Sequence, residues 1–179
     1  MSRRNILLLI LGAVILVVGT IGGTIAVTAT VAQKPRVPSD AALFVFDTNT
    51  ALAEDGHQWE WNDDAYASLS ESDSQARLTC PPGSTNVASF MATFGNERTP
   101  SAWTMWEFLG YGTNQTSILL APLTPDRMGS GAGQGIHKSG GTFSLGIACT
   151  KNNNLDVTAA YYRAMTVQPG GLWTLEPVK

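Results

Sequence analysis

The sequence predicts a mainly β protein, an antiparallel β-sandwich domain preceded by one N-terminal transmembrane helix. A run of 29 uncharged residues, from Asn5 to Gln33, follows two arginines near the start of the chain. Short apolar segments with period-two alternation then recur between clusters of turn residues. Two cysteines, Cys80 and Cys149, lie at the ends of two apparent core strands. Together these patterns predict a small disulfide-linked β domain behind a membrane segment.

The first element is the segment 1–33, which we interpret as a transmembrane helix that stays on the mature protein. Ile6–Ala26 supplies 21 nearly continuous apolar residues, and about 20 are needed to cross a bilayer. A cleaved signal peptide is the other interpretation, with Ile6–Val18 as its apolar stretch and small residues before Gln33 as the cleavage site. Cleavage would release a secreted soluble domain.

Arg3 and Arg4 set the expected orientation of this segment. Because basic residues stay on the cytoplasmic side, the N-terminus is expected in the cytoplasm and the C-terminal domain outside the cell. The expected location is therefore the plasma membrane, crossed once. Within the segment, small residues share adjacent helix rows and predict close packing against another membrane helix: Gly19, Gly22, Gly23 and Ala26.

The second element is a linker over 34–41, in which Pro35 and Pro38 favour an extended backbone. The remaining residues, 42–179, match the size of one domain. Beyond residue 32 the chain has 14 acidic and 9 basic residues, a net charge near −5. This surface gives no electrostatic reason to bind nucleic acid. Charged residues make up only 14% of the chain, a composition typical of extracellular β proteins.

Within 42–179, alternating or continuous apolar segments predict the strands. Between them lie clusters rich in Gly, Pro, Ser and Asn, which predict turns. We expect Glu54–Ser74 to be a loop with a helical turn and Gly129–Gly135 to be a flexible connection between strands. The expected strands are 42–47, 86–94, 103–109, 116–120, 142–149, 157–167 and 172–175.

The two cysteines are expected to form a disulfide, because an even cysteine count outside the membrane usually means a bridge. A bridge that closes a loop of about 70 residues contributes roughly 4 kcal/mol on the chain-entropy model. A metal site is the weaker interpretation, since Cys80 and Cys149 with His57 and His137 show no ligand spacing. No metal or other cofactor is expected.

Trp103 and Trp106 lie between the cysteines, in an order similar to that of immunoglobulin-like domains. The stretch AYYRAMTVQPGGLWTLEP (Ala160–Pro177) resembles the closing strands of β-sandwich domains in actinobacterial cell-surface proteins, and LGIACT (Leu145–Thr150) resembles them less closely. This resemblance implies a surface-displayed domain without catalytic activity. Such proteins often end in a sortase signal, which the sequence lacks, so we expect the N-terminal helix to anchor the chain.

Two groups of side chains are candidates for binding. Trp59 and Trp61 could stack on a sugar ring or enter a pocket of a partner. A group of carboxylates could hold Ca²⁺, although no EF-hand loop is present: Asp55, Glu60, Asp63 and Asp64. No nucleophile motif accompanies His57 or His137, so we expect no enzyme. A tethered hydrolase is the remaining catalytic interpretation.

The expected function is therefore that of a single-pass membrane-anchored extracellular β-sandwich that acts by protein contact. It would serve in surface adhesion or as a subunit of a cell-envelope assembly. The alternative is an envelope-tethered carbohydrate-binding module. The expected partners are membrane lipid, another protein subunit or a second copy of the chain, and in the alternative a glycan.

Overall fold

The computed structural model describes residues 35–109, 117–118, 121–129 and 132–178. The predicted transmembrane helix, with Gly19, Gly22, Gly23 and Ala26, lies outside these residues. No helix within the described ranges is long and apolar enough to cross a membrane. The described residues belong to the unit Gln33–Lys179, and the account below concerns this unit.

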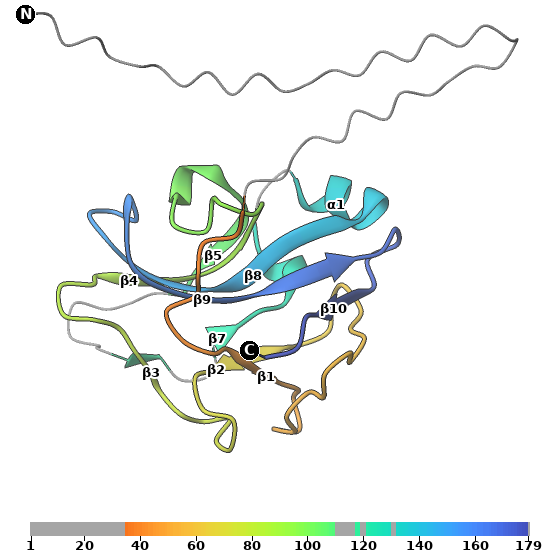
Figure 1. Cartoon of the computed structure of the whole chain (residues 1–179), viewed down its shortest axis with the longest axis horizontal. Helices are drawn as coiled ribbons and strands as arrows, with labels where there is room; N and C mark the ends of the chain where they lie inside the picture. The colour runs from red at the N-terminus through yellow and green to blue at the C-terminus, as the bar shows by residue number, and fades with distance from the viewer. Residues whose placement is uncertain (1–34, 110–116, 119–120, 130–131, 179) are drawn as a thin grey trace, which may run out of the picture. The chain divides into compact units, whose positions relative to one another are not determined.

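The largest element of the fold is an antiparallel sheet of five strands in the order β10-β9-β8-β4-β5 (Figure 1). Its long central hairpin consists of β8 and β9, paired from Gly141↔Val167 to Lys151↔Asp156. β4 pairs with β8 on one side, and β10 pairs with the end of β9 on the other. The strands are β4 (Asn86–Ala92), β5 (Trp103–Phe108), β8 (Gly141–Lys151), β9 (Asp156–Val167) and β10 (Trp173–Leu175).

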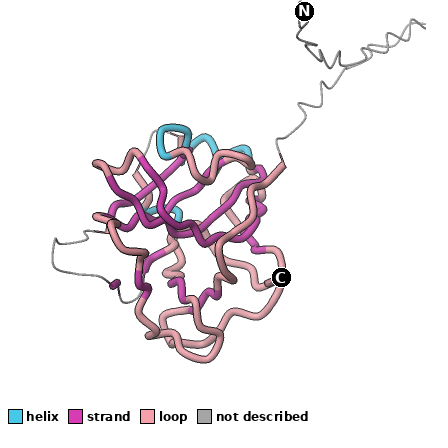
Figure 2. Tube along the Cα trace, turned by 60° about the vertical axis from the view of Figure 1, so that its left-hand side comes forward, coloured by secondary structure: helices cyan, strands magenta, loops and turns pink. Residues whose placement is uncertain are grey.

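A second sheet of three short strands lies beneath the first, with the order β1-β2-β7 (Figure 1). Much of this half of the molecule is loop (Figure 2). Its strands are β1 (Phe44–Phe46), β2 (Tyr66–Ser68) and β7 (Ala121–Pro122), while β3 (Leu78–Thr79) pairs with β6 (Ser117–Ile118). The helical elements are η1 (Pro100–Ala102), η2 (Pro125–Arg127) and α1 (Gly133–Ser139).

The core lies between the two sheets, as expected of a β-sandwich. We call this group the inner cluster; it takes side chains from both sheets, among them Val45, Ala67, Ala121, Val87, Met91, Leu145 and Ile147. The opposite face of the five-stranded sheet carries an outer cluster of Ala88, Phe90, Ala92, Trp103, Ala148, Ala160 and Tyr162. The prediction of a mainly β, sandwich-like domain is confirmed.

The predicted disulfide is also confirmed. Cys80 follows β3 and Cys149 lies in β8, with Cα atoms 5.7 Å apart. Both cysteines belong to the inner cluster. The bridge therefore fixes the β3 segment against the five-stranded sheet. Trp103 belongs to the outer cluster and Trp106 packs against it, so these tryptophans do not share the inner cluster with the disulfide.

Two local expectations were wrong. The segment 54–74 contains a strand, β2, because Ala67 and Ser68 are buried against β1 and β7. The glycine-rich connection ends in a helix, α1, because Ile136 is buried in the inner cluster and fixes this turn of backbone. The small residues of β8, Ser144 and Ala148, are buried as fully as the large ones; the period-two pattern does not mark a solvent face here.

Candidate functional site

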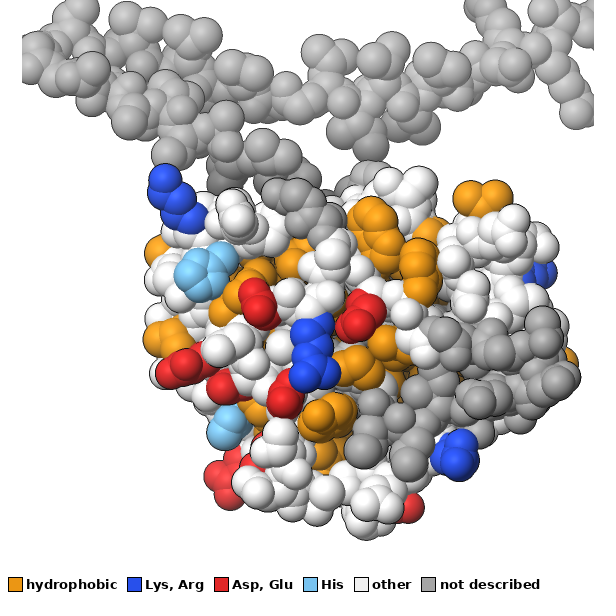
Figure 3. All heavy atoms as spheres, turned by 180° about the vertical axis from the view of Figure 1, so that it is seen from behind, with side chains coloured by type: hydrophobic (Ala, Val, Ile, Leu, Met, Phe, Trp, Pro, Cys, Tyr) orange, Lys and Arg blue, Asp and Glu red, His pale blue; other side chains and the backbone are white. Residues whose placement is uncertain are grey.

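A pocket of about 360 Å³ lies where the loop before β2, the end of η2 and helix α1 meet. The face seen in Figure 3 carries both histidines of the chain, beside hydrophobic and acidic side chains. Apolar side chains form the floor and one wall, and polar side chains stand at the rim, an arrangement typical of ligand sites. The residues used below are Trp61, Met105, Asp126, Met128, Gln134 and His137.

Two buried methionines, Met105 and Met128, form the floor of the pocket. Met105 lies on β5, and Met128 directly precedes Gly129, which forms an antiparallel bridge with Trp106. The two methionines thus flank one bridge on neighbouring backbones, within reach of each other's long side chains. Gly133 leaves room above them, since a Cβ there would lie 2.9 Å from Met105 Cε.

Trp61 and His137 form the aromatic side of the pocket. Their rings meet edge to face, with centroids 5.5 Å apart and planes at 81°. A tight turn holds them together: the Gly170 amide donates to the His137 carbonyl at 2.9 Å. Gly171 adopts φ +92°, and a Cβ there would lie 2.4 Å from His137 Cδ2. Only glycine both tolerates this φ and leaves space for the imidazole.

Trp59 does not join Trp61 in this pocket, which corrects the expectation of a paired contact surface. Its side chain is only 3% exposed and stacks on Trp173 with centroids 5.3 Å apart. The backbones of Trp59 and Trp173 exchange two hydrogen bonds of 2.9 Å, which extend the five-stranded sheet beyond β10. Trp59 is therefore a core residue. His57 packs edge-on against it, with ring centroids 4.5 Å apart.

The four predicted calcium ligands do not converge. Asp55 Oδ1 lies 3.2 Å from Arg163 Nη2, and Asp64 Oδ1 lies 2.9 Å from Arg127 Nη2. Asp63 Oδ2 accepts the Glu60 amide at 2.7 Å. Over the described ranges no group of three or more His, Cys, Asp or Glu side chains is placed to hold a metal ion.

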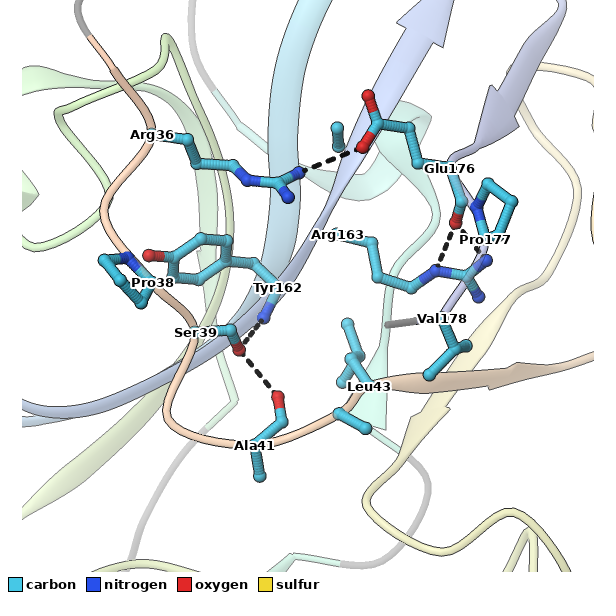
Figure 4. A pocket seen from close by; sticks show the side chains of 12 residues that line it. Arg36, Pro38, Ser39, Ala41, Leu43, Tyr162, Arg163, Glu176, Pro177 and Val178 are labelled. Atoms are coloured by element: carbon cyan, nitrogen blue, oxygen red, sulfur yellow. Dashed lines mark hydrogen bonds and ion pairs between the residues drawn. The ribbon is translucent and has the colours of Figure 1, made fainter.

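A second pocket, of about 380 Å³, lies between the expected linker and the C-terminal residues (Figure 4). Arg163 reaches into this region from β9 and donates to the Glu176 carbonyl through Nε at 2.7 Å. Burial lowers the pKa of Arg163, and the nearby Asp55 opposes this shift. Arg36 lies 3.5 Å from the Glu176 carboxylate. These cations already have acidic or carbonyl partners, so this pocket is a structural junction.

The expected linker lies along the edge of β9. Asp40 donates its amide to the Ala160 carbonyl at 3.0 Å and accepts the Ala160 amide on Oδ2 at 2.8 Å. Ser39 Oγ accepts the Tyr162 amide at 3.0 Å (Figure 4). Two side-chain oxygens thus satisfy strand amides that β10 does not reach. We call residues 37–41 the edge latch.

Tyr162 fastens the same segment from the outer face. Its hydroxyl donates to the Val37 carbonyl, and its ring packs edge-on against Phe90, with centroids 6.0 Å apart. Burial raises the pKa of Tyr162 to about 12, and the nearby Glu97 carboxylate adds to the rise. The phenol is therefore a neutral donor across the physiological range.

The tip of the β8–β9 hairpin has an unusual backbone. Asn152, Asn153 and Asn154 have φ values of 51°, 55° and 66°, three consecutive left-handed residues that are not glycine. Thr150 Oγ1 donates to Asn154 Oδ1 at 2.7 Å, and Asn152 Nδ2 donates to the Asp156 carboxylate. Leu155 follows this turn and is 72% exposed.

Sequence reasoning missed Met105, Met128 and the role of His137 at the pocket. No motif in the sequence accompanies His137; it lies exposed on α1, with its ring against Trp61. Its spacing from Gly133, one helical turn, was the available signal. No family model, curated protein or solved structure matches the chain.

Proposed function

We propose that this chain is a single-pass membrane protein that displays an extracellular β-sandwich and acts by protein contact, through the tip of the β8–β9 hairpin. The observation that carries the contact is Leu155, a large apolar side chain 72% exposed at the end of the longest hairpin. Apolar side chains held at such a position suit insertion into a pocket of a partner.

The rigidity of the tip supports this function. Each left-handed residue other than glycine costs about 1–3 kcal/mol, and such strain concentrates at functional segments. Among residues other than glycine, asparagine and aspartate tolerate this region best, and the turn is held by hydrogen bonds that Asn152 donates and Asn154 accepts. The backbone that carries Leu155 is thus held by the turn, which lowers the entropic cost of binding.

The location rests on two other observations. The uncharged run Asn5–Gln33 is long enough to span a bilayer. The disulfide Cys80–Cys149 suits an oxidising compartment. Cleavage of the same run would give a secreted form with the same contact surface, and the intact mass of the protein from native membranes distinguishes the two.

We also propose that the sandwich is of the immunoglobulin-like class. Two stacked antiparallel sheets and a disulfide within the core support it. The strand order β10-β9-β8-β4-β5 and the position of Trp103 on the outer face depart from it. The carbohydrate-binding alternative loses its two-indole platform, because Trp59 is buried.

The contact is tested with a photo-crosslinking amino acid at position 155 of the full chain in its native membrane. Leu52, also exposed but on the opposite half of the fold, provides the matched control position. We expect a discrete crosslinked protein from position 155 only, and loss of its co-purification on Leu155→Ser but not on Leu52→Ser. Equal crosslinking from both positions, or unchanged association of Leu155→Ser, would refute the contact.

A further inference from the structure

We propose that the pocket beside Trp61 is a binding site for Cu(I), with the thioethers of Met105 and Met128 and the imidazole of His137 as its ligands. The indole of Trp61 would lie against the ion. This site is independent of the contact at Leu155, which lies at the far end of β9.

The first argument is the convergence of these side chains on one pocket. Two of the four methionines in the described residues form its floor, and they flank the bridge between Trp106 and Gly129. The Cβ position of Gly133 lies 3.6 Å from Met105 Sδ. His137 follows Gly133 by one helical turn, on the same face of α1. The Met105 thioether, from β5, and the His137 imidazole, from α1, thus lie near the same face of the helix.

The second argument is ligand chemistry. Thioethers are soft donors that select Cu(I), and imidazole is a good copper ligand. The hard cations Ca²⁺ and Mg²⁺ require several oxygen ligands, whereas this floor offers sulfur. Cys80 and Cys149, the only cysteines, are bound to each other. Methionine therefore supplies the soft donors that this pair cannot.

The third argument is electrostatic. Glu107 lies two residues after Met105, on the same face of β5. The antiparallel bridge between Trp106 and Gly129 places Glu107 across from Met128. Its Oε2 is buried without a hydrogen-bond partner, and so is Oγ of Ser89, its cross-strand neighbour. Unpaired buried oxygens of this kind are costly. Glu107 does not itself line the pocket; Asp126 is the carboxylate that does, and it places negative charge at the rim.

Trp61 completes the site on its partly exposed side. An indole face against a desolvated cation contributes through the ring quadrupole. The indole is held by its contact with His137 and by the hydrogen bond of 3.3 Å from the Asp126 amide to the Trp61 carbonyl. Copper binding is therefore expected to change the fluorescence of Trp61.

The test is a titration of the full chain in mild detergent with Cu(I), kept reduced by ascorbate without oxygen, in competition with the chromogenic chelator bicinchoninate. We expect about one Cu(I) per chain. The double variant Met105→Leu/Met128→Leu preserves side-chain volume and should weaken binding by at least about tenfold. His137→Gln, an exposed position that does not threaten the fold, should weaken it comparably.

The matched control is Met91→Leu/Met165→Leu, which changes two buried methionines away from the pocket. This control should keep the affinity of the unchanged chain. The proposal is overturned if the full chain does not compete with the chelator, if the two double variants lose affinity equally, or if Met105→Leu/Met128→Leu with an unchanged unfolding midpoint retains full affinity. The proposal is supported if the copper X-ray absorption spectrum shows sulfur ligands in the unchanged chain and none in Met105→Leu/Met128→Leu.

Discussion

The two faces of the five-stranded sheet are stabilised in different ways. The inner face packs branched and sulfur-containing side chains directly against the second sheet and carries the disulfide. The outer face has a row of alanines, Ala88, Ala148 and Ala160, in one cluster with the rings of Phe90, Trp103 and Tyr162. Its cover consists of irregular segments held by polar groups. Burial on a sheet face therefore does not require a second sheet.

Polar groups fix how the irregular segments pack on the outer face of the five-stranded sheet. Glu97, which is completely buried, accepts a hydrogen bond of 2.9 Å from Ser144 Oγ. The Trp103 indole stacks on Phe90 with centroids 4.8 Å apart and donates to the Glu97 carbonyl at 3.1 Å. Buried carboxylates cost free energy unless they are well paired, and Glu97 Oε2 has no partner in the described structure. The unpaired oxygen of Glu97 thus lowers the stability of the outer face, while the hydrogen bonds of Glu97 fix how the covering loop packs there.

The largest expected effect concerns the inner face. Replacing Cys80 and Cys149 by serine should lower the free energy of unfolding by about 4 kcal/mol, because the unfolded chain regains the entropy that the bridge removes. Equilibrium denaturation in urea measures this change. A loss confined to the experimental error would mean that the inner cluster holds the β3 segment without the bridge.

The next effect is on the outer face, where Gly146 lies between Phe90 and Tyr162. A Cβ at Gly146 would lie 2.1 Å from the Tyr161 carbonyl oxygen and 2.5 Å from Tyr162 Cβ. Gly146→Ala should therefore cost about 3 kcal/mol of stability, at the upper end for overpacking. Gly135→Ala on α1, with nothing within 4 Å, is the control and should be neutral or slightly stabilising. Equal effects would contradict the tight outer face.

A smaller effect is expected from the edge latch. Asp40→Ala removes the acceptor of the Ala160 amide and the ion pair of 2.6 Å with Arg98. The expected cost is about 1–2 kcal/mol, mostly from the strand amide left without its partner. Hydrogen exchange should show faster exchange at the Ala160 amide. Glu71→Ala, an exposed substitution, should leave that rate unchanged; a similar rate in both variants would exclude the latch.

The smallest effect at neutral pH comes from Tyr162. Its folded-state pKa of about 12 is higher than the ordinary 10.0, so the unfolded chain loses this proton first as the pH rises. Stability from Tyr162 is fully present below about pH 10 and falls as the pH approaches 12. Urea denaturation of Tyr162→Phe between these pH values should show a shallower decline than the unchanged protein. Parallel declines would contradict the burial of the phenol.

Sequence patterns predicted the large sheet better than the small one. Period-two alternation located β4, β5, β8 and β9, which have 6 to 12 residues each and thus a full repeat to detect. β2, β3 and β7 have only 2 or 3 residues, too few for a periodic signal. They form strands because tertiary contacts pair them, and local propensity does not show this.

The candidate site could be predicted only in part. Trp61 was recognised as a candidate from its residue type, and the disulfide was predicted from the even number of cysteines. The pocket itself depends on a bridge between Trp106 and Gly129 and on the turn at Gly171 beside His137. These contacts join positions far apart in the chain, and no local pattern carries that information. Trp59 was grouped with Trp61 because they are neighbours in sequence, although β10 buries only one of them.

The edge latch also determines how the domain responds to a mechanical load. A pull on the N-terminal end of the described domain loads the Arg36–Glu176 ion pair and then Val37 to Ala41, which run antiparallel to β9 and are fastened at Ala160 and Tyr162. These fastenings are one backbone bond, from the Asp40 amide to the Ala160 carbonyl, and side-chain bonds of Ser39, Asp40 and Tyr162. Their release frees five residues, about 17 Å of extended chain, before tension reaches Leu43 and the core. The domain thus has a short extensible segment between its N-terminal end and its packed sheets.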